Sequence, residues 1–222
     1  ALQSDNQRLR DELEVRRFGA IIGSSPVMSG LFERVERVAA TPVSVLILGE
    51  TGTGKELIAR ELHARSDRAR GPFVAINCGA IPHELIETEL FGHVKGAFTH
   101  AHQDKLGSLR AADGGTLFLD ELGTLSAGAQ ERLLRAVEYG EITRIGANKP
   151  VRVDVRIVAA TNEHLPAMVD KGRFRADLLD RLSFDVITLP PRRARDGDIA
   201  QLADFFGRRM AAELDWPRWP GF

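Results

Sequence analysis

From Val43 onward, short apolar runs rich in β-branched residues alternate with longer stretches whose apolar positions recur at helical spacing. The apolar runs predict strands at 43–48, 73–76, 116–119, 155–160 and 186–189. The stretches between and after them predict helices at 55–65, 82–90, 127–138, 165–171, 175–181 and 196–214. Several runs are apolar at every position, as in strands buried on both faces of a parallel sheet covered by helices. Repeated strand–helix units of this kind predict a doubly wound α/β fold.

The first residues follow a different pattern, which predicts a helical linker over 1–17. Residues 2–16 are polar and favour a helix, with apolar positions at Leu2, Leu9 and Leu13. If Leu2 and Leu9 occupy the d positions of two heptads, Asn6 and Leu13 fall at a. A single Asn at an a position favours a parallel dimer. A solvated amphipathic helix fits the same residues, and two heptads do not decide between the two.

The composition is typical of a soluble globular protein. The 222 residues are 43% hydrophobic and 27% charged, enough for one α/β domain or for one domain and a fragment. With 30 basic and 31 acidic residues the net charge is -1, so no overall field attracts nucleic acid or an anionic membrane. The single Cys78 excludes an internal disulfide and fits a reducing compartment. No apolar run reaches the roughly 18 residues of a membrane span and no signal peptide opens the chain, so we expect a cytoplasmic protein.

The two ends suggest a piece of a longer protein. The chain begins with Ala1 rather than Met. It closes on residues 216–222, where aromatic and turn-forming residues have nothing after them to pack against.

A phosphate-binding loop is predicted directly after the first strand. It consists of Gly49, Glu50, Thr51, Gly52, Thr53, Gly54 and Lys55, and a helix follows. The glycines let backbone N–H groups converge on phosphate oxygens, the helix N-terminus adds positive potential, and the lysine reaches the terminal phosphates. Spacing and context favour this over a plain glycine-rich turn. Glu56 follows, where a Ser or Thr hydroxyl normally binds Mg²⁺, so the metal must rely on phosphates, water and a second acidic site.

The second acidic site is predicted at Asp120 and Glu121, which end the strand at 116–119. Ligands of open α/β sheets bind at the carboxyl ends of the strands. We expect Asp120 to hold Mg²⁺ through water and Glu121 to polarise the attacking water. The alternative is an acidic pair that merely caps a strand, and the apolar run leading into the pair argues against it.

The nucleotide is predicted to be ATP rather than GTP. Residues 120–123 (Asp-Glu-Leu-Gly) also satisfy the D-x-x-G pattern of GTPases, which requires a guanine-reading Asn-Lys-x-Asp later in the chain. The nearest match, residues 148–151 (Asn-Lys-Pro-Val), lacks the aspartate.

Polar residues also end two further strands. Thr161 and Asn162 follow the strand at 155–160 and are candidates for sensing the γ-phosphate or orienting water. Asn77 ends the strand at 73–76, where its side chain could hydrogen-bond Glu121 and hold it away from water. For all three, a turn role at a strand end remains an equal alternative.

With these motifs, the chain resembles the AAA+ central domain of bacterial enhancer-binding proteins, the activators of sigma-54-dependent transcription, and among them the phage-shock-protein activator type. The resemblance runs from about Ile22 to Phe222. Its most specific element matches the GAFTGA loop of this family at five of six positions and consists of Gly96, Ala97, Phe98, Thr99, His100 and Ala101.

The resemblance implies a role for each motif. Residues 49–56 match the Walker A loop, including Glu56, and Asp120 with Glu121 match Walker B. Asn77 matches the asparagine that pairs with the catalytic glutamate, and Thr161 with Asn162 match sensor I. Residues 140–146 match the second pore loop, which moves with the GAFTGA loop.

The segment 174–181 matches the one whose two arginines, here Arg175 and Arg181, reach the ATP of a neighbouring subunit. Such arginine fingers can accelerate hydrolysis ~10³–10⁵-fold and require a ring. Similarity to the family therefore implies a hexamer, with a dimer as an off-state. Helix-surface ion pairs with Asp177 and Asp180 are the alternative reading of these arginines.

The family resemblance implies an ATPase that uses its loop to remodel closed complexes of sigma-54 and RNA polymerase. We expect an AAA+ core at 18–191 and only the start of a helical lid at 192–222, with DNA contacts made by a domain outside this chain. His100 departs from the family glycine, which would adopt a positive φ at no cost. A regulatory or scaffold module that binds nucleotide but no longer engages sigma-54 is therefore the alternative.

Overall fold

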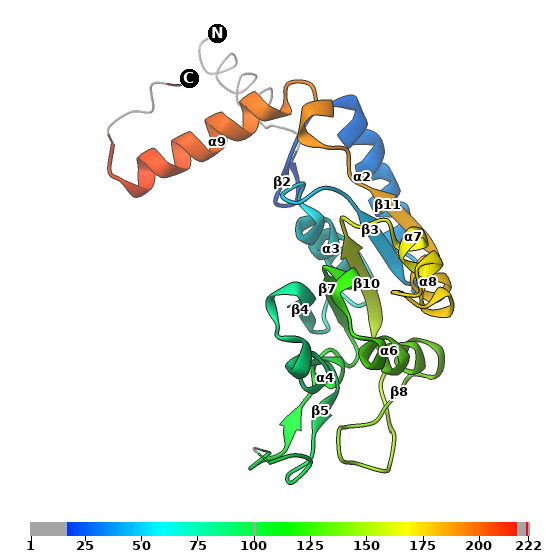
Figure 1. Cartoon of the computed structure of the whole chain (residues 1–222). Helices are drawn as coiled ribbons and strands as arrows, with labels where there is room; N and C mark the ends of the chain where they lie inside the picture. The colour runs from blue at the N-terminus through cyan, green and yellow to red at the C-terminus, as the bar shows by residue number, and fades with distance from the viewer. Residues whose placement is uncertain (1–16, 100, 217–220, 222) are drawn as a thin grey trace. The chain divides into compact units, whose positions relative to one another are not determined.

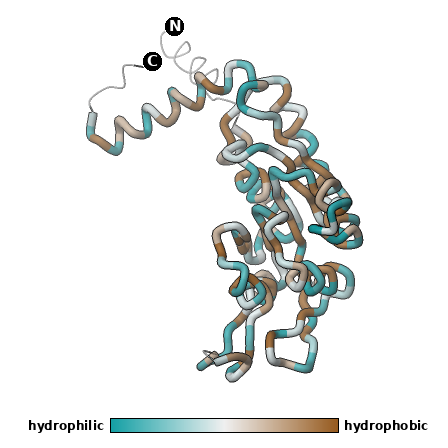
Figure 2. Tube along the Cα trace, in the orientation of Figure 1, coloured by the Kyte–Doolittle hydropathy of each residue, from teal (hydrophilic) through white to brown (hydrophobic). Residues whose placement is uncertain are grey.

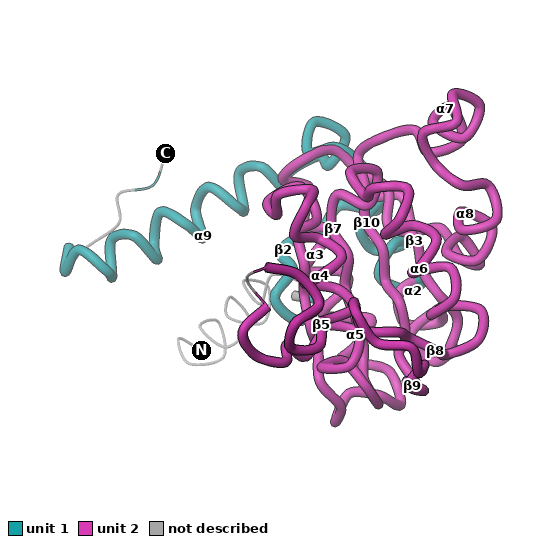
Figure 3. The backbone as a smooth tube through the Cα atoms, turned by 60° about the horizontal axis from the view of Figure 1, so that its bottom comes forward, with its two compact units in different colours: residues 1–34, 190–222 teal, residues 35–189 magenta. Residues whose placement is uncertain are grey.

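The computed structural model describes residues 17–99, 101–216 and 221. The chain divides into two compact units, residues 1–34 with 190–222, and residues 35–189 (Figure 3). The predicted N-terminal helix with its heptads, and His100, lie outside the described residues. No helix in the described ranges is long and apolar enough to cross a membrane.

The larger unit is built on a five-stranded, wholly parallel sheet (Figure 1). Its strands are β3 (Val45–Leu48), β4 (Phe73–Asn77), β7 (Thr116–Asp120), β10 (Arg156–Thr161) and β11 (Asp185–Thr188). They lie in the order β11-β3-β10-β7-β4. The predicted parallel sheet is confirmed, and each predicted strand is found within two residues of its predicted ends. The apolar residues of β3, β7 and β10 are buried almost without exception, which explains the missing alternation of polar positions in the sequence.

Strand register decides which residues meet at the carboxyl edge of this sheet. Thr161 at the end of β10 lies opposite Leu48 at the end of β3. On the other side of β10, Ala159 lies opposite Leu119, one residue before Asp120. Asn77, which ends β4, pairs with Asp120 itself. Loops that leave these four strands therefore start from one edge.

The predicted helices of this unit are also present. They are α3 (Lys55–Ala64), α4 (His83–Phe91), α6 (Ala127–Tyr139), α7 (Leu165–Asp170) and α8 (Ala176–Leu182). The short α5 (Ser108–Ala111) and the 3-10 helices η1 (Cys78–Ala80) and η2 (Leu122–Thr124) were not predicted. Helices α6 and α8 pack side by side (Figure 1).

Two small antiparallel ladders, also absent from the sequence-based expectation, carry the long loops. One pairs β5 (Gly92–His93) with β6 (Lys105–Leu106), and the other pairs β8 (Glu141–Ile142) with β9 (Val151–Arg152). Strands of two residues are too short to show a period in the sequence. A bridge between His93 and Ile145 joins the first ladder to the loop of the second.

In the smaller unit, the ladder of β1 (Arg17–Phe18) with β2 (Ile21–Ile22) precedes α2 (Pro26–Ala39), a helix that runs on into the larger unit. The sequence analysis missed this helix, although its buried residues Met28, Leu31 and Val35 have helical spacing. The carboxylate of Asp198, the first residue of α9 (Asp198–Glu213), accepts hydrogen bonds from the backbone N–H groups of Ser24 and Ser25 at 2.8 and 3.0 Å.

A 3-10 turn, η3 (Arg192–Ala194), leads into α9. Hydrophobic and hydrophilic residues alternate along α9 (Figure 2), and several of its apolar side chains are exposed, namely Ile199, Phe206, Met210 and Leu214.

A buried arginine fixes the amino end of β10. Arg156 is 2% exposed, and its guanidinium donates to the backbone oxygens of Val38 (2.9 Å), Ala39 (3.2 Å) and Val43 (3.2 Å). Val38 and Ala39 belong to the last turn of α2, whose carbonyls lack helical partners. Burial, and to a lesser degree the charge of Arg68, lowers the pKa of Arg156. A cation at the end of a helix also interacts favourably with its dipole.

Replacing this arginine is expected to destabilise the fold. Arg156→Met leaves three carbonyls without their donor, so the free energy of unfolding should fall by about 2–4 kcal/mol. Denaturant titration followed by circular dichroism measures it. The matched control is Arg152→Met, whose side chain is 90% exposed and should change stability by less than about 0.5 kcal/mol. Equal effects of the two substitutions would contradict the anchoring role.

Candidate functional site

The predicted phosphate loop connects β3 to α3 and has the backbone conformation that anion binding requires. Gly54 precedes α3 with φ of 100°, and Gly52 has φ of 78°, values that only glycine adopts without strain. No side chain caps the N-terminus of α3. The first N–H groups of the helix, with the positive end of its dipole, therefore suit an anion rather than a side chain of the protein.

Lys55 supplies a positive charge that no neighbouring acid neutralises. Its side chain is buried, and its ammonium group donates to the backbone oxygens of Gly49 (3.1 Å) and Glu50 (3.3 Å). Within the described part of the chain, no carboxylate forms an ion pair with this lysine. A buried cation held only by neutral carbonyls favours the arrival of an anion.

The loop opens onto a pocket of about 190 Å³ that gathers predicted residues from separate parts of the sequence. Its lining consists of Thr51, Gly52, Gly54, Lys55, Glu56, Asp120, Glu121 and Asn162. Two other loop residues face inward instead: the Thr53 hydroxyl donates to the Glu50 carbonyl at 2.7 Å, and Gly49 packs against Leu189. The structure thus brings together the residues predicted to hold phosphate and those predicted to manage metal and water.

Asp120 and Glu121 turn sharply out of β7. Asp120 accepts a hydrogen bond from the N–H of Glu121 at 2.9 Å. Glu121 itself has φ of 54° and ψ of 45°, a left-handed conformation that is uncommon for a residue with a side chain and recurs at functional sites. The backbone N–H and hydroxyl of Thr124 both donate to its carbonyl, at 3.0 and 2.8 Å, and hold this geometry.

The Glu121 carboxylate lies directly against Gly79. A Cβ built at Gly79 would lie 1.7 Å from Oε2 of Glu121, so any larger residue would displace the carboxylate from its present place. The sequence analysis missed Gly79, because nothing in a lone glycine shows what packs against it.

Asn77 is close to Glu121 but bonded elsewhere. Its side-chain oxygen accepts hydrogen bonds from the N–H groups of Gly79 (2.9 Å) and Ala80 (3.1 Å), which caps η1. The expected hydrogen bond to Glu121 is therefore absent in this state, and the turn role considered from the sequence is the one observed. Both side chains nevertheless flank Gly79.

The two residues after β10 differ in their surroundings. Thr161 is fully buried, and its hydroxyl accepts from the N–H of Glu163 at 3.0 Å. Asn162 lines the pocket and donates to the Thr51 hydroxyl at 3.3 Å. Only Asn162 is thus placed to contact a bound molecule directly.

Three carboxylates border the pocket, Glu56, Asp120 and Glu121. Glu56 forms an ion pair with Arg60 at 2.6 Å, one helical turn along α3. Oxygen ligands are those Mg²⁺ prefers, and Mg²⁺ usually binds through one or two carboxylates, water and phosphate. Asp120 and Glu121 fit this donor set, whereas Glu56 already has a partner.

Neither predicted arginine finger lines the pocket of its own chain. Arg175 forms two hydrogen bonds with Asp177, at 3.0 and 2.7 Å, which raise the pKa of Arg175 and lower that of Asp177. This is the ion pair that the sequence analysis considered. Arg181 instead pairs with Glu138 at 2.9 Å, not with Asp180.

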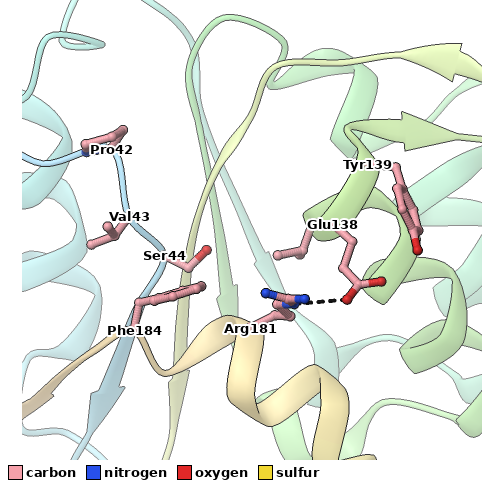
Figure 4. A pocket seen from close by; sticks show the side chains of 8 residues that line it. Pro42, Val43, Ser44, Glu138, Tyr139, Arg181 and Phe184 are labelled. Carbon is pink, nitrogen blue, oxygen red and sulfur yellow. Dashed lines mark hydrogen bonds and ion pairs between the residues drawn. The ribbon is translucent and has the colours of Figure 1, made fainter.

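The Arg181–Glu138 pair lies in a second pocket of about 420 Å³ (Figure 4). Residues 42–44, which precede β3, form one wall, so this pocket lies at the amino end of the sheet. The phosphate loop follows the carboxyl end of the same strand. The larger pocket is therefore separate from the candidate nucleotide site.

The GAFTGA-like loop connects β5 to β6. Gly96 has φ of 80°, and its N–H donates to the carbonyl of Ala101 at 2.8 Å. Phe98 is 41% exposed, and its ring makes an edge contact with His93 at 4.9 Å between centroids. His93, the last residue of β5, thus packs against the aromatic residue of this loop.

The second loop lies against the first. A Cβ built at Gly146 would be 2.7 Å from the Cβ of Ala97. The N–H of Val94 donates to the carbonyl of Ile145 at 3.0 Å. The two loops matched to the family are therefore in direct contact.

A family model described as the "Sigma-54 interaction domain" matches residues 21–188. The chain belongs to this family. The Psp operon transcriptional activator of Escherichia coli K12 is 51% identical over 202 residues, covering 91% of this chain and 62% of that protein. The anaerobic nitric oxide reductase transcription regulator NorR of Vibrio vulnificus YJ016 is 52% identical over 194 residues, covering 87% and 38%. The chain thus spans less than two thirds of the length of these relatives.

Solved structures agree on the fold of this sigma-54 interaction domain. NtrX from Brucella abortus in complex with ADP has 38% sequence identity and a TM-score of 0.82, covering 95% of this chain and 45% of that one. A P-loop NTPase domain of an E. coli sigma-54 activator, at 21% identity and a TM-score of 0.54, shows the fold alone. The AAA+ P-loop NTPase fold expected from the sequence is confirmed.

Cys78, at the start of η1, is buried beside the acids of this sigma-54 interaction domain. Burial first, and then the charges of Asp120 and Glu121, raise the pKa of its thiol to about 12. The thiolate is the reactive form, so this cysteine is chemically inert in the folded protein.

This inertness can be tested because the chain has a single cysteine. A pKa of about 12 in place of the usual ~8.5 leaves roughly 10³-fold less thiolate at pH 8. Reaction with a chromogenic disulfide reagent should therefore be at least roughly 10³-fold slower in the native protein than in urea. A native rate within tenfold of the unfolded rate would contradict the burial and charge described here.

Proposed function

We propose that this member of the sigma-54 interaction domain family binds ATP with Mg²⁺, hydrolyses it as a cytoplasmic hexamer, and remodels closed complexes of sigma-54 and RNA polymerase. The observation that carries the proposal is the convergence on one pocket of Lys55, Asp120, Glu121 and Asn162, from elements at the ends of three adjacent strands. A phosphate loop alone would support binding. The acidic pair beside it supports hydrolysis.

ATP fits the site by charge. The lysine without an acidic partner and the uncapped start of α3 together favour a polyphosphate. NtrX, which is 38% identical, has been solved with ATP and with ADP. The sequence lacks the aspartate that would read guanine after residues 148–149.

The chemistry assigns a different task to each acid. Asp120 would hold Mg²⁺ through water, and the metal when bound would offset the charge that develops on the phosphates. Glu121 would accept a proton from the attacking water or orient it. Asn162 would sense the γ-phosphate through the phosphate loop, because its side chain donates a hydrogen bond to Thr51 of that loop. Asn77 stands beside Glu121 at Gly79, so the two can pair once the carboxylate moves.

Arg175 and Arg181 would complete the site of the next subunit. Each is partly exposed and lies in α8 or at its start, away from its own nucleotide pocket. Their acidic partners are exposed or partly exposed, and such ion pairs are readily exchanged for a phosphate. An arginine supplied in trans stabilises transition-state charge and can raise the rate ~10³–10⁵-fold. This sharing requires a ring, with a dimer as the off-state.

The loop at 96–101 would contact sigma-54. Its aromatic Phe98 is partly exposed at a turn, where an apolar side chain suits a partner surface. Contact between this loop and residues 145–146 lets nucleotide-dependent movements reach both. DNA contacts would come from a domain outside this chain.

The alternative is a regulatory or scaffold module that binds nucleotide but no longer engages sigma-54. The feature in its favour is His100, which occupies a position where the GAFTGA pattern has glycine.

Two substitutions separate binding from chemistry. Lys55→Ala should abolish nucleotide binding, because the buried cation is lost. Glu121→Gln should keep binding and lower the turnover number at least ~100-fold, because the amide cannot accept the proton. Binding is measured by titration with a fluorescent ATP analogue, and turnover by phosphate release. Glu84→Gln, on the exposed side of α4, serves as the control. Retained hydrolysis in the Glu121 variant would remove that residue from catalysis, and a clear preference for GTP would overturn the nucleotide assignment.

Sigma-54 engagement is tested by trapping. The chain, extended to include a complete lid, is incubated with ADP and a metal fluoride, and binding to sigma-54 is measured by native gel shift. We expect a stable complex that Phe98→Ala abolishes. Persistent failure to bind, with rescue by His100→Gly, would favour the regulatory alternative.

A further inference from the structure

Gln130 is a buried polar residue of α6 that the nucleotide site itself does not use. It is 2% exposed and forms three hydrogen bonds. Its amide nitrogen donates to the carbonyls of Leu125 (2.9 Å) and Arg173 (3.1 Å). Its amide oxygen accepts from the backbone N–H of Arg175 at 2.9 Å. Three of its four hydrogen-bonding positions are therefore satisfied inside the protein.

The bonds to Arg173 and Arg175 form a pair like that between neighbouring strands. The C=O of one residue and the N–H of the residue two further on point to the same side of an extended segment. Arg175 has φ of -81° and ψ of 130°, so the backbone is extended there, and α8 starts at the next residue. No side chain caps α8, and Gln130 is bonded to the backbone at its start. The N–H groups of Arg173 and Phe174 also donate to the carbonyl of Met168, at 2.8 and 3.3 Å.

The third bond links this segment to the catalytic loop. Leu125 follows η2, the turn that begins after Glu121. Thr124 donates twice to the carbonyl of Glu121, and Leu125 donates to the carbonyl of Leu122 at 3.2 Å. The path from Glu121 to Gln130 thus consists of short, hydrogen-bonded turns.

We propose that Gln130 is a positioning residue that sets where each subunit presents Arg175 to the nucleotide of its neighbour. This inference rests on the proposed function, in which Arg175 acts in trans. The guanidinium of Arg175 is exposed, and among the described residues its ion-pair partner is Asp177 in the first turn of the same helix. Its reach therefore depends on where its backbone is held, and Gln130 bonds directly to the N–H of this residue. Gln130 also bonds the carbonyl of Leu125, which follows the turn after Glu121. The backbone of Arg175 is therefore connected through Gln130 to the catalytic loop of its own subunit.

The experiment mixes two defective forms of the chain. One form carries Arg175→Ala and keeps an intact pocket, and the other carries Lys55→Ala and keeps an intact finger. If the finger acts between subunits, the mixture hydrolyses ATP although neither form does so alone. Gln130→Met, which keeps the length of the side chain and removes all three hydrogen bonds, is then placed in one form or the other.

We expect a position-dependent loss. In the finger-donating Lys55→Ala form, Gln130→Met should lower the hydrolysis rate of the mixture at saturating ATP at least tenfold. In the Arg175→Ala form the loss should be less than threefold, because that subunit provides no finger. Leu133→Val, which weakens the packing of the same helix without touching these hydrogen bonds, should change the rate less than threefold in either form.

A merely structural role would give equal losses in the two forms, and that result, or no loss in the donating form, would overturn the proposal. If circular dichroism shows that Gln130→Met is unfolded at the assay temperature, Gln130→Glu replaces it. This variant keeps the acceptor for Arg175 but loses both donated bonds and places a carboxylate against the carbonyls of Leu125 and Arg173, so a smaller loss, still confined to the finger-donating form, is expected. If the mixture without any change at Gln130 fails to hydrolyse ATP, the trans role of Arg175 is wrong and the inference falls with it. Success of that mixture with no effect of Gln130 would overturn the inference alone.

Discussion

The parallel pairing of β10 with both β3 and β7 is the constraint on which the site depends. Because the three strands run the same way in fixed register, the phosphate loop, the acidic pair and Asn162 all leave from one edge. Residues far apart in the sequence then line one pocket without any long-range ion pair between them. Slippage of β10 by a single residue would turn its side chains to the opposite face and separate these groups. Arg156 opposes such slippage by fastening the amino end of the strand to three carbonyls.

The positive charge of Lys55 in the pocket is available to bind an anion. Lys55 donates to two backbone carbonyls, whereas Arg60 and Arg68 each form an ion pair, with Glu56 and Asp154. The acids on the opposite wall are held by backbone geometry, with Glu121 in a left-handed conformation and its carboxylate over Gly79. The same acids, together with burial, keep Cys78 protonated. Strain and uncompensated charge therefore coincide at one place, as is common at functional sites.

The sequence predicted the sheet and the nucleotide motifs because both depend on local signals, namely continuous apolar runs and a glycine-rich loop before a helix. It did not predict α2, whose apolar spacing was present but was overlooked beside the stronger pattern downstream. The two-residue ladders could not be predicted from the sequence, because strands so short show no periodicity of apolar residues. A partner set by tertiary packing was also missed, since Arg181 pairs with Glu138 rather than Asp180. For Asn77 the sequence left two roles open, and the side chain caps η1 rather than bonding Glu121. In the sequence Gln130 looks like an ordinary helix residue, because its three hydrogen bonds depend on tertiary structure.

The space at Gly79 has a consequence for where the carboxylate of Glu121 can lie. One additional carbon atom there would meet the end of the Glu121 side chain, which would have to take another rotamer. A side chain at position 79 would therefore shift the acid relative to the pocket while leaving the backbone turn at Glu121 in place.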